Sequence, residues 1–362
     1  MRRSRFQRSS SPLSSLFTAA WHVWWKVQLF AVGVLHMLFS SDKQWPRLTE
    51  EASGSLSSSR VSSWDGSDDV RKQKRIIFVR HAESEWNVVF NRGVLWRAVV
   101  NFFRAVVREW LMLPTSDSIF LDSPLSRRGH LQAQNLQEQV CETSLRLRGS
   151  ADSDSLNEEI TGFSARRDHQ HAPHASPDRA LLRHLCCPMP NSVVVASNLR
   201  RAIDTARIAS ASRLEVPGEK IHVLSSLQEI GRNIDTLALS DAYKIESPAL
   251  LQSWRGEKRH DELFNVTENH GNKAVLGSGR DRMLRFAQWV FKQPQEVVVV
   301  YGHSLWFRSF CQEFFPDEVY HEAKSIKLHN CGVASFLLEK RGGGGSDKAQ
   351  FAIQPDSFQH LL

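Results

Sequence analysis

Short apolar runs alternate with longer amphipathic stretches over residues 75–340. Runs rich in Val and Ile predict buried strands at Arg75–Val79, Ser192–Ala196, Ile221–Leu224, Glu296–Tyr301 and Val333–Leu338. Apolar residues at helical spacing predict helices over Leu125–Leu145, Leu199–Ala211, Asp281–Lys292 and Ser304–Phe315. This alternation is typical of an α/β fold. We therefore expect a three-layer sandwich in which helices flank a mostly parallel central sheet.

The N-terminal segment 1–41 has no acidic residue and contains the apolar run Leu16–Phe39. That run is long enough to span a bilayer, which needs ~20 residues. Small and polar residues interrupt it on one helical stripe: Thr18, His22, Lys26, Gly33, His36 and Ser40. Three interpretations stay open, namely a transmembrane anchor, a helix at a membrane surface and a mitochondrial or other organellar presequence. We expect a membrane-associated protein, single-pass or peripheral.

Three further segments have little apolar periodicity. Residues 42–74 are rich in Ser and charge and are expected to form a flexible linker. Residues from about 146 to 180 are expected to form a disordered insertion, and residues 341–362 a tail. The folded domain is therefore expected to span 75–340.

A second amphipathic segment spans residues 94–113. Its polar face carries Arg97, Asn101, Arg104 and Arg108 at helical spacing, and its other faces are apolar. Two interpretations stay open. The segment packs on its own domain as a cap near the active site, or it lies on a membrane, so that membrane contact would run through 16–39 and 94–113.

Charge and cysteine content exclude several classes of protein. The formal charge is +7, from 46 Lys and Arg against 39 Asp and Glu, and much of the excess lies outside the predicted domain. We therefore predict no nucleic-acid partner. The five cysteines form no C-x-x-C pair, and His169, His171 and His174 lack acidic or Cys partners at ligand spacing. The sequence thus predicts neither a disulfide scaffold nor a metal site.

Histidine and arginine residues directly follow three of the predicted strands. Arg80 and His81 follow the first, Arg201 lies shortly after the second, and His303 follows a late one. The carboxyl ends of parallel strands meet at one edge of a sheet, so these side chains should converge. Arginine forks match phosphate oxygens, and a neutral histidine is a nucleophile toward phosphorus. The pattern indicates a site for an anion with several oxygens.

The residues around these positions form an ordered set of motifs: Arg80-His81-Ala82-Glu83-Ser84 with Asn87; Asp122-Ser123-Pro124-Leu125-Ser126 with Gly129, Gln132 and Ala133; Ser197 to Ala206; Leu227 with Glu229; Gly302-His303-Ser304; and Asn330-Cys331-Gly332-Val333. This set resembles the motifs of the histidine phosphatase superfamily, which also contains the cofactor-dependent phosphoglycerate mutases. The resemblance covers about residues 75–340, apart from the insertions.

The resemblance implies a catalytic set of His81, Glu229 and His303 and a phosphate-binding set of Arg80, Asn87, Arg201 and His303. His81 would carry a transient phosphohistidine. Glu229 would protonate the leaving oxygen and then activate water. The cationic side chains would stabilise the moving charge, so neither a metal nor another cofactor is expected.

The residues next to Glu229 separate the possible activities. Mutases of the superfamily have a Glu-Arg-His-Tyr-Gly-type segment there, whereas this chain has Gln228-Glu229-Ile230-Gly231-Arg232. The difference favours a metal-independent phosphomonoester hydrolase acting on a phosphorylated small molecule or a phosphoprotein. The alternatives are a membrane-held phosphoprotein phosphatase, a 2,3-bisphosphoglycerate-dependent mutase and a catalytically silent, membrane-associated binding protein. The complete set of expected site residues disfavours the silent protein.

Overall fold

The computed structural model describes residues 12–43, 72–90, 95–160, 180–245, 260–342 and 350–362. The strands in these ranges are β1 (Lys72–Arg80), β2 (Ser192–Ser197), β3 (Ile221–Leu224), β4 (Phe264–Asn265), β5 (Val297–Gly302), β6 (Val333–Arg341), β7 (Gln350–Ile353) and β8 (Gln359–His360). They form one sheet in the order β4-β3-β2-β5-β1-β6-β7, with β8 paired to β6. The strands from β4 to β1 pair in parallel, and those on the β6 side pair antiparallel.

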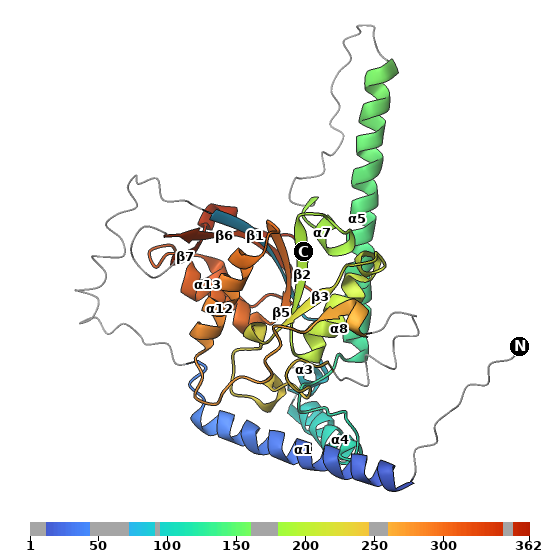
Figure 1. Ribbon diagram of the computed structural model, residues 1–362, viewed down its shortest axis with the longest axis vertical. Coiled ribbons are helices and arrows are strands. Elements are labelled where there is room, and N and C mark those ends of the chain that lie inside the picture. The colour runs from blue at the N-terminus through green and yellow to red at the C-terminus, as the bar shows by residue number, and fades with distance from the viewer. Residues whose placement is uncertain (1–11, 44–71, 91–94, 161–179, 246–259, 343–349) are drawn as a thin grey trace, which may run out of the picture.

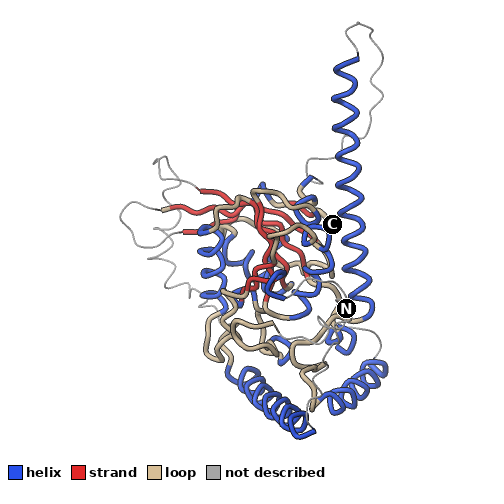
Figure 2. Tube along the Cα trace, turned by 45° about the vertical axis from the view of Figure 1, so that its right-hand side comes forward, coloured by secondary structure: helices blue, strands red, loops and turns tan. Residues whose placement is uncertain are grey.

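The described α-helices are α1 (Pro12–Phe39), α3 (Glu85–Phe90), α4 (Leu95–Met112), α5 (Arg127–Ile160), α7 (Arg183–Cys186), α8 (Arg200–Ala209), α9 (Ala211–Leu214), α11 (His260–Leu263), α12 (Gly279–Lys292) and α13 (Ser304–Phe314). Short 3-10 turns include η1 (Ser225–Leu227) and η2 (Ile234–Thr236). Figures 1 and 2 show α12 and α13 on one face of the sheet and α5, α7 and α8 on the other.

Side chains of the central strands alternate between two cores. In β1, Ile76 and Phe78 join the core beneath α12 and α13, whereas Ile77 and Val79 join the core beneath α5 and α8. Successive residues of a strand point to opposite faces, so a strand buried on both faces has a continuous apolar run. The predicted three-layer α/β sandwich is confirmed.

The predicted strands and helices of the domain are all present, with the largest change of an end at α5. Two segments differ from expectation. Helix α5 continues to Ile160, into the region expected as an insertion, while residues 161–179 lie outside the described ranges. The segment 341–362, expected as a tail, contributes β7 and β8, which both pair with β6. Pairing with β6 satisfies backbone groups that its free edge would otherwise expose.

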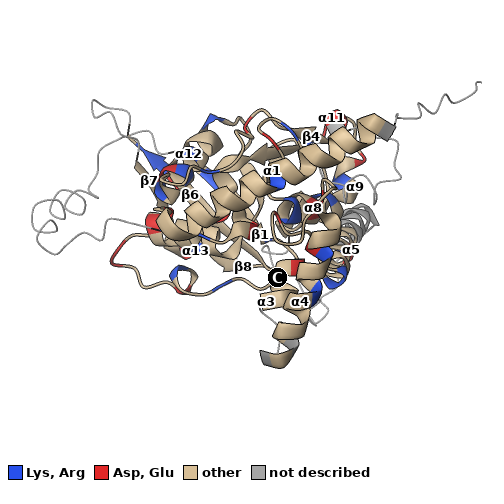
Figure 3. Cartoon of the chain, turned by 90° about the horizontal axis from the view of Figure 1, so that it is seen from below, with Lys and Arg blue, Asp and Glu red and all other residues tan. Residues whose placement is uncertain are grey.

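Helix α1 lies against the domain (Figures 1 and 3), and the part of its small and polar stripe from Lys26 to Ser40 is buried there. Lys26, His36 and Ser40 are buried, while Trp21 and Trp24 on other faces are exposed. Lys26 Nζ donates to the Met112 carbonyl at 2.6 Å, at the C-terminal end of α4. A cation there also interacts favourably with the helix dipole.

The expected transmembrane helix is wrong, and so is the membrane-associated localisation drawn from it. Among the described residues, no helix combines the length and apolar character needed to cross a membrane. The physical reason lies in the interrupted apolar run: Lys26 and His36 form hydrogen bonds to carbonyls of the domain. Such polar side chains are costly in hydrocarbon.

The second amphipathic segment forms α4, which packs on its own domain. Ala105 lies in a small core with Val89, Ile119 and Phe120. The buried carboxylate of Glu109 accepts from the Ile119 amide at 2.6 Å. These contacts favour the first of the two interpretations, a helix packed on its domain, and nothing supports the expected membrane contact through 16–39 and 94–113.

Candidate active site

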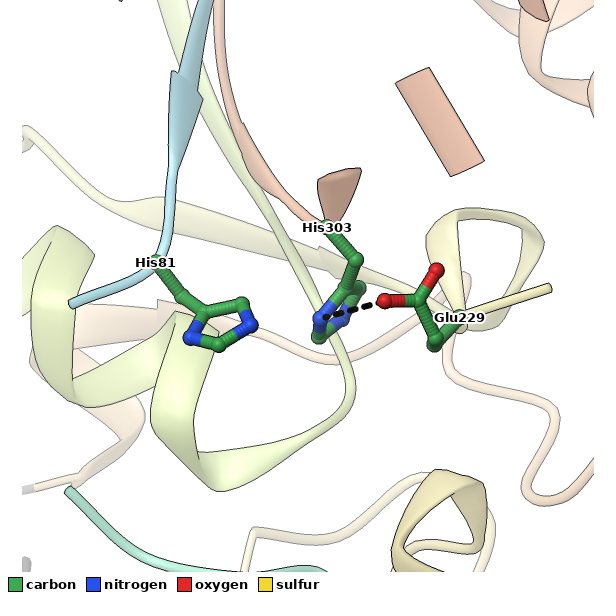
Figure 4. Close-up of side chains that lie close together, drawn as sticks. All are labelled: His81, Glu229 and His303. Atoms are coloured by element: carbon green, nitrogen blue, oxygen red, sulfur yellow. Dashed lines mark ion pairs between the residues drawn. The ribbon is translucent and has the colours of Figure 1, made fainter. Parts of the chain in front are cut away.

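The ends of β1 and β5 bring the two expected histidines together. Arg80 is the last residue of β1 and pairs with Gly302, the last residue of β5. The His81 amide donates to the Gly302 carbonyl at 2.9 Å, and His303 follows directly. The rings of His81 and His303 therefore lie with their centroids 5.1 Å apart. Figure 4 shows Glu229 on the far side of His303.

The hydrogen bond of the His81 ring sets its tautomer. Nδ1 lies 2.6 Å from the Ala82 carbonyl oxygen, which only accepts, so Nδ1 donates its proton there. In a neutral ring, Nε2 then carries the free lone pair. Burial lowers the pKa of His81 well below its usual value, and the charges of Arg201 and Arg80 lower it further. The His81 ring is thus neutral and oriented near pH 7, the state that attack on phosphorus would need.

The segment after His81 is held by residues of the other motifs. Asn330 Nδ2 donates to the His81 carbonyl at 3.0 Å, and the Ala82 amide donates to Thr205 Oγ1 at 3.0 Å. A Cβ atom on Gly129 would lie 2.0 Å from the Glu83 carbonyl oxygen, so only glycine allows this close approach. These residues position His81 without contacting its ring.

Arg201 is buried and Arg80 is half-buried, and the charges of both guanidinium groups act on the two histidines. Arg80 Nη1 donates to the Leu328 carbonyl. Arg201 Nη1 donates to the Asp235 carbonyl at 2.8 Å, and its Nη2 lies 3.5 Å from Asp235 Oδ2. Sequence reasoning missed Asp235, because it lies in a loop without periodicity and no motif includes it.

Asp122, the first residue of its motif, connects the start of α8 to the loop after Glu229. Its Oδ1 accepts from the Arg200 amide at 2.9 Å, and its Oδ2 accepts from the Leu239 amide at 3.1 Å. Burial raises the pKa of Asp122 to about 6. The carboxylate fixes the first turn of α8, where Arg201 lies.

Glu229 is buried between α13 and His303. Its Oε1 accepts from the Trp306 amide at 3.0 Å, and its Oε2 lies 3.9 Å from His303 Nδ1. Burial is the main cause that raises the pKa of Glu229 to about 7. The charge of Arg201 lowers this pKa, and the charge of Asp235 raises it. A carboxyl group with this pKa can both give and take a proton at neutral pH.

His303 presents unpaired nitrogens at the centre of the cluster. The residue is fully buried, and neither ring nitrogen has a hydrogen-bond partner within the described ranges. Buried polar atoms are normally satisfied, so these nitrogens are free to form hydrogen bonds with a bound molecule. Burial lowers the pKa of His303 well below its usual value, and Arg201 lowers it further.

Asn87 lies in the first turn of α3. Its Oδ1 accepts from the Ser84 amide at 3.2 Å and from Ser84 Oγ at 3.1 Å. These hydrogen bonds give Asn87 a structural role in the turn that begins α3. Its contact with a phosphoryl group stays a prediction.

The cluster also has the donor types of a metal site. Ligand atoms of His81, Glu229 and His303 all lie within 4.8 Å of one another. Two histidines and a glutamate suit a divalent cation such as zinc. However, the charges of Arg80 and Arg201, which lower the pKa values of both histidines, disfavour a cation and favour an anion. The absence of a metal requirement stays a prediction.

Solved structures with similar chain paths include two phosphatases. One is a mycobacterial glucosyl-3-phosphoglycerate phosphatase, with 15% identity, coverage of 78% of this chain and 98% of that chain, and a TM-score of 0.34. The other is a phosphoserine phosphatase from Entamoeba histolytica, with 15% identity, coverage of 80% and 99%, and a TM-score of 0.33. A search of curated proteins found no match.

The family model of the histidine phosphatase superfamily (branch 1) matches residues 178–345. This range includes Arg201, Glu229 and His303 and begins after the His81 motif. The match confirms the resemblance noted from the motifs, and it supports phosphatase chemistry. Over residues 178–345 this chain is therefore similar to the histidine phosphatase superfamily.

Proposed function

We propose that this chain is a metal-independent phosphomonoester hydrolase that transfers a phosphoryl group first to His81 and then to water. One observation carries the proposal. A neutral His81, with Nε2 free, shares one buried cluster with two guanidinium groups and a carboxyl group whose pKa is about 7. This combination suits a phosphate monoester dianion.

In the first step, His81 Nε2 attacks phosphorus, and the bond from phosphorus to the leaving oxygen breaks. Protonated Glu229 gives its proton to that oxygen, so the product leaves as an alcohol. Arg80, Arg201 and His303 hold the equatorial oxygens as charge shifts onto them, and Asn87 adds a hydrogen bond.

In the second step, water attacks the phosphohistidine. The Glu229 carboxylate takes a proton from the water as the new bond to phosphorus forms. The nitrogen–phosphorus bond breaks and its electron pair returns to His81 Nε2. Inorganic phosphate leaves, and both side chains regain their starting protonation states.

Internal contacts of the segment after Glu229 support a hydrolase over a mutase. Ile230 is buried in the core beneath α12 and α13, and the Gly231 amide donates to Asp42 Oδ2 at 3.0 Å. Where mutases of the superfamily present substrate-binding side chains, this chain uses its residues to hold its own structure. The substrate is a phosphorylated small molecule or a phosphoprotein.

The test is phosphate release from p-nitrophenyl phosphate by the full chain, with and without EDTA. We expect release that survives EDTA and falls by at least ~1000-fold in His81→Ala, because the nucleophile is lost. His360→Ala, at an exposed position on β8, is the matched control and should retain activity. Acid-labile phosphate on the quenched wild-type enzyme should be absent from His81→Ala. Activity that disappears with EDTA, or persists in His81→Ala, would refute the mechanism.

A further inference from the structure

Asp42 lies just beyond the end of α1 and is only 2% exposed. Its Oδ2 accepts from Lys273 Nζ at 2.9 Å and from the Gly231 amide at 3.0 Å. Its Oδ1 accepts from Arg282 Nη2. The sequence pattern had placed this residue at the start of a flexible linker, whereas the structure buries it against two cations.

Both cations also hold the backbone on either side of Glu229. Lys273 Nζ donates to the Glu229 carbonyl at 2.8 Å and to the Gly231 carbonyl at 2.7 Å. Arg282 Nη1 donates to the Gln228 carbonyl. Backbone groups of three residues in the segment 228–231 thus bind one buried charge network.

Asp42 is the carboxylate that pairs with both cations of the network. Burial alone would raise the pKa of Asp42, but Arg282 and Lys273 outweigh this effect and hold it below its usual value. Burial lowers the pKa of Lys273 to about 8, against the opposing effect of Asp42. Removal of one partner from a buried ion pair leaves an uncompensated charge, so loss of Asp42 should displace the cations and the backbone bound to them.

Other residues of α1 contact the loop that follows. A Cβ atom on Gly33 would lie 2.6 Å from Ile234 Cγ2, and Trp25 Nε1 donates to the Leu239 carbonyl at 3.0 Å. The N-terminal helix therefore contacts the loop at two further points, and Asp42, just beyond the helix, adds a buried charged contact.

We propose that Asp42 is a positioning residue for the catalytic acid. Through Lys273 and Arg282 it fixes the segment 228–231, so that the Glu229 carboxyl group meets the leaving oxygen. The inference rests on the proposed function of Glu229. It makes a segment N-terminal to the catalytic domain part of its active-site support.

The test compares two substrates in the full-length protein. p-Nitrophenolate leaves readily without a proton, whereas the alkoxide of an alkyl phosphate such as β-glycerophosphate does not. In Asp42→Asn we expect kcat/KM, which reports only the transfer to His81, to fall about 100-fold for the alkyl phosphate and less than about fivefold for p-nitrophenyl phosphate, because the misplaced acid limits that step only where the leaving oxygen needs a proton. The inhibition constant of inorganic phosphate should change less than about threefold, since Arg80 and Arg201 are untouched.

Asp241→Asn is the matched control. Asp241 is exposed and pairs with Lys244 at the surface, and the same substitution there should leave both kcat/KM values unchanged. Equal losses on both substrates in Asp42→Asn would show a general structural role and overturn the inference. Unchanged kinetics would overturn it as well.

Lys273→Met gives a second route if Asp42→Asn fails to fold, because it leaves Asp42 paired with Arg282. It should show the same selective loss on the alkyl phosphate. If Asp42→Asn and Lys273→Met both fold, the double variant should lose no more activity on the alkyl phosphate than either single variant, since the two residues act as one unit. Glu229→Gln separates the two proposals. If it shows no selective loss, the role of Glu229 fails; if it does and the network variants do not, only the inference about Asp42 fails.

Discussion

Asp235 holds Arg201 by two contacts, a 2.8 Å hydrogen bond from Arg201 Nη1 to its backbone carbonyl and a 3.5 Å approach of Nη2 to its carboxylate. Asp235 lies in the same loop as Glu229. The loop that carries the proposed acid therefore also orients a proposed phosphate-binding arginine. A change at Asp235 itself should therefore affect phosphate binding through Arg201.

Substitution of Asp235 should weaken the hold on Arg201. In Asp235→Asn we expect KM for a phosphate monoester to rise about tenfold, because a charge-assisted contact of the guanidinium is lost. Steady-state kinetics with p-nitrophenyl phosphate measures the change. Asp356→Asn, at an exposed position, is the control. An unchanged KM would mean that the carbonyl contact alone orients Arg201.

The pH dependence of kcat/KM should follow the ionisation of Glu229. The first step needs Glu229 protonated, and burial raises its pKa to about 7, so kcat/KM for an alkyl phosphate should fall as pH rises above about 7. His81 stays neutral through this range, since its pKa lies well below its usual value. Glu229→Gln should lower activity and abolish this alkaline limb. A wild-type profile that stays flat to about pH 9 would contradict the assignment.

The same raised pKa means that ionisation of Glu229 should lower the stability of the folded protein as pH rises. The native state binds this proton more tightly than the unfolded chain, so stability is lost as pH rises from the ordinary value of 4.5 through about 7. Glu229→Gln cannot ionise and keeps the oxygen that accepts from the Trp306 amide. It should be more stable than wild type at alkaline pH by up to about 3 kcal/mol, with little difference under acid conditions.

Urea unfolding of both proteins on either side of pH 7 measures this difference. The gap between their free energies of unfolding should widen as pH rises. A gap independent of pH would show that Glu229 keeps an ordinary pKa in the native state.

The substitution Gly33→Ala tests the packing of α1, because packing and helix propensity predict opposite changes in stability. Helix propensity alone predicts that Gly33→Ala stabilises a helix by about 1 kcal/mol. The new Cβ would lie 2.6 Å from Ile234 Cγ2, so we expect destabilisation instead. Thr18→Ala, at an exposed α1 position, is the control and should be neutral or slightly stabilising. A stabilised Gly33→Ala protein would mean that α1 does not pack on Ile234.

The residues expected to act on phosphate are brought together largely as the sequence predicts. His81 and His303 directly follow strands rich in Val and Ile, and Arg201 lies in the first turn of the helix after another such strand. Local periodicity identifies such strands, and parallel pairing brings their carboxyl ends together. Glu229 was identified from its motif alone, and the phosphate contact of Asn87 remains a prediction.

The supporting residues lie beyond such local rules. Asp235 and Asp42 belong to segments without periodicity, and Asp42 binds Lys273 across 231 residues of sequence. Composition marks such acids as solvent-exposed by default. Their burial depends on cations contributed by distant elements.

The sequence by itself determined the α/β sandwich, the strand ends that carry the site and the stripe of small and polar residues along α1. Only the tertiary structure decided what that stripe faces. Periodicity shows which residues share a face of a helix, but it does not show what the face contacts. Lys26 and His36 form hydrogen bonds to carbonyl groups of the domain, so the helix packs beside the Glu229 loop. The expected membrane span was wrong for this reason. The polar residues that interrupt the apolar run are the ones that pack against the domain.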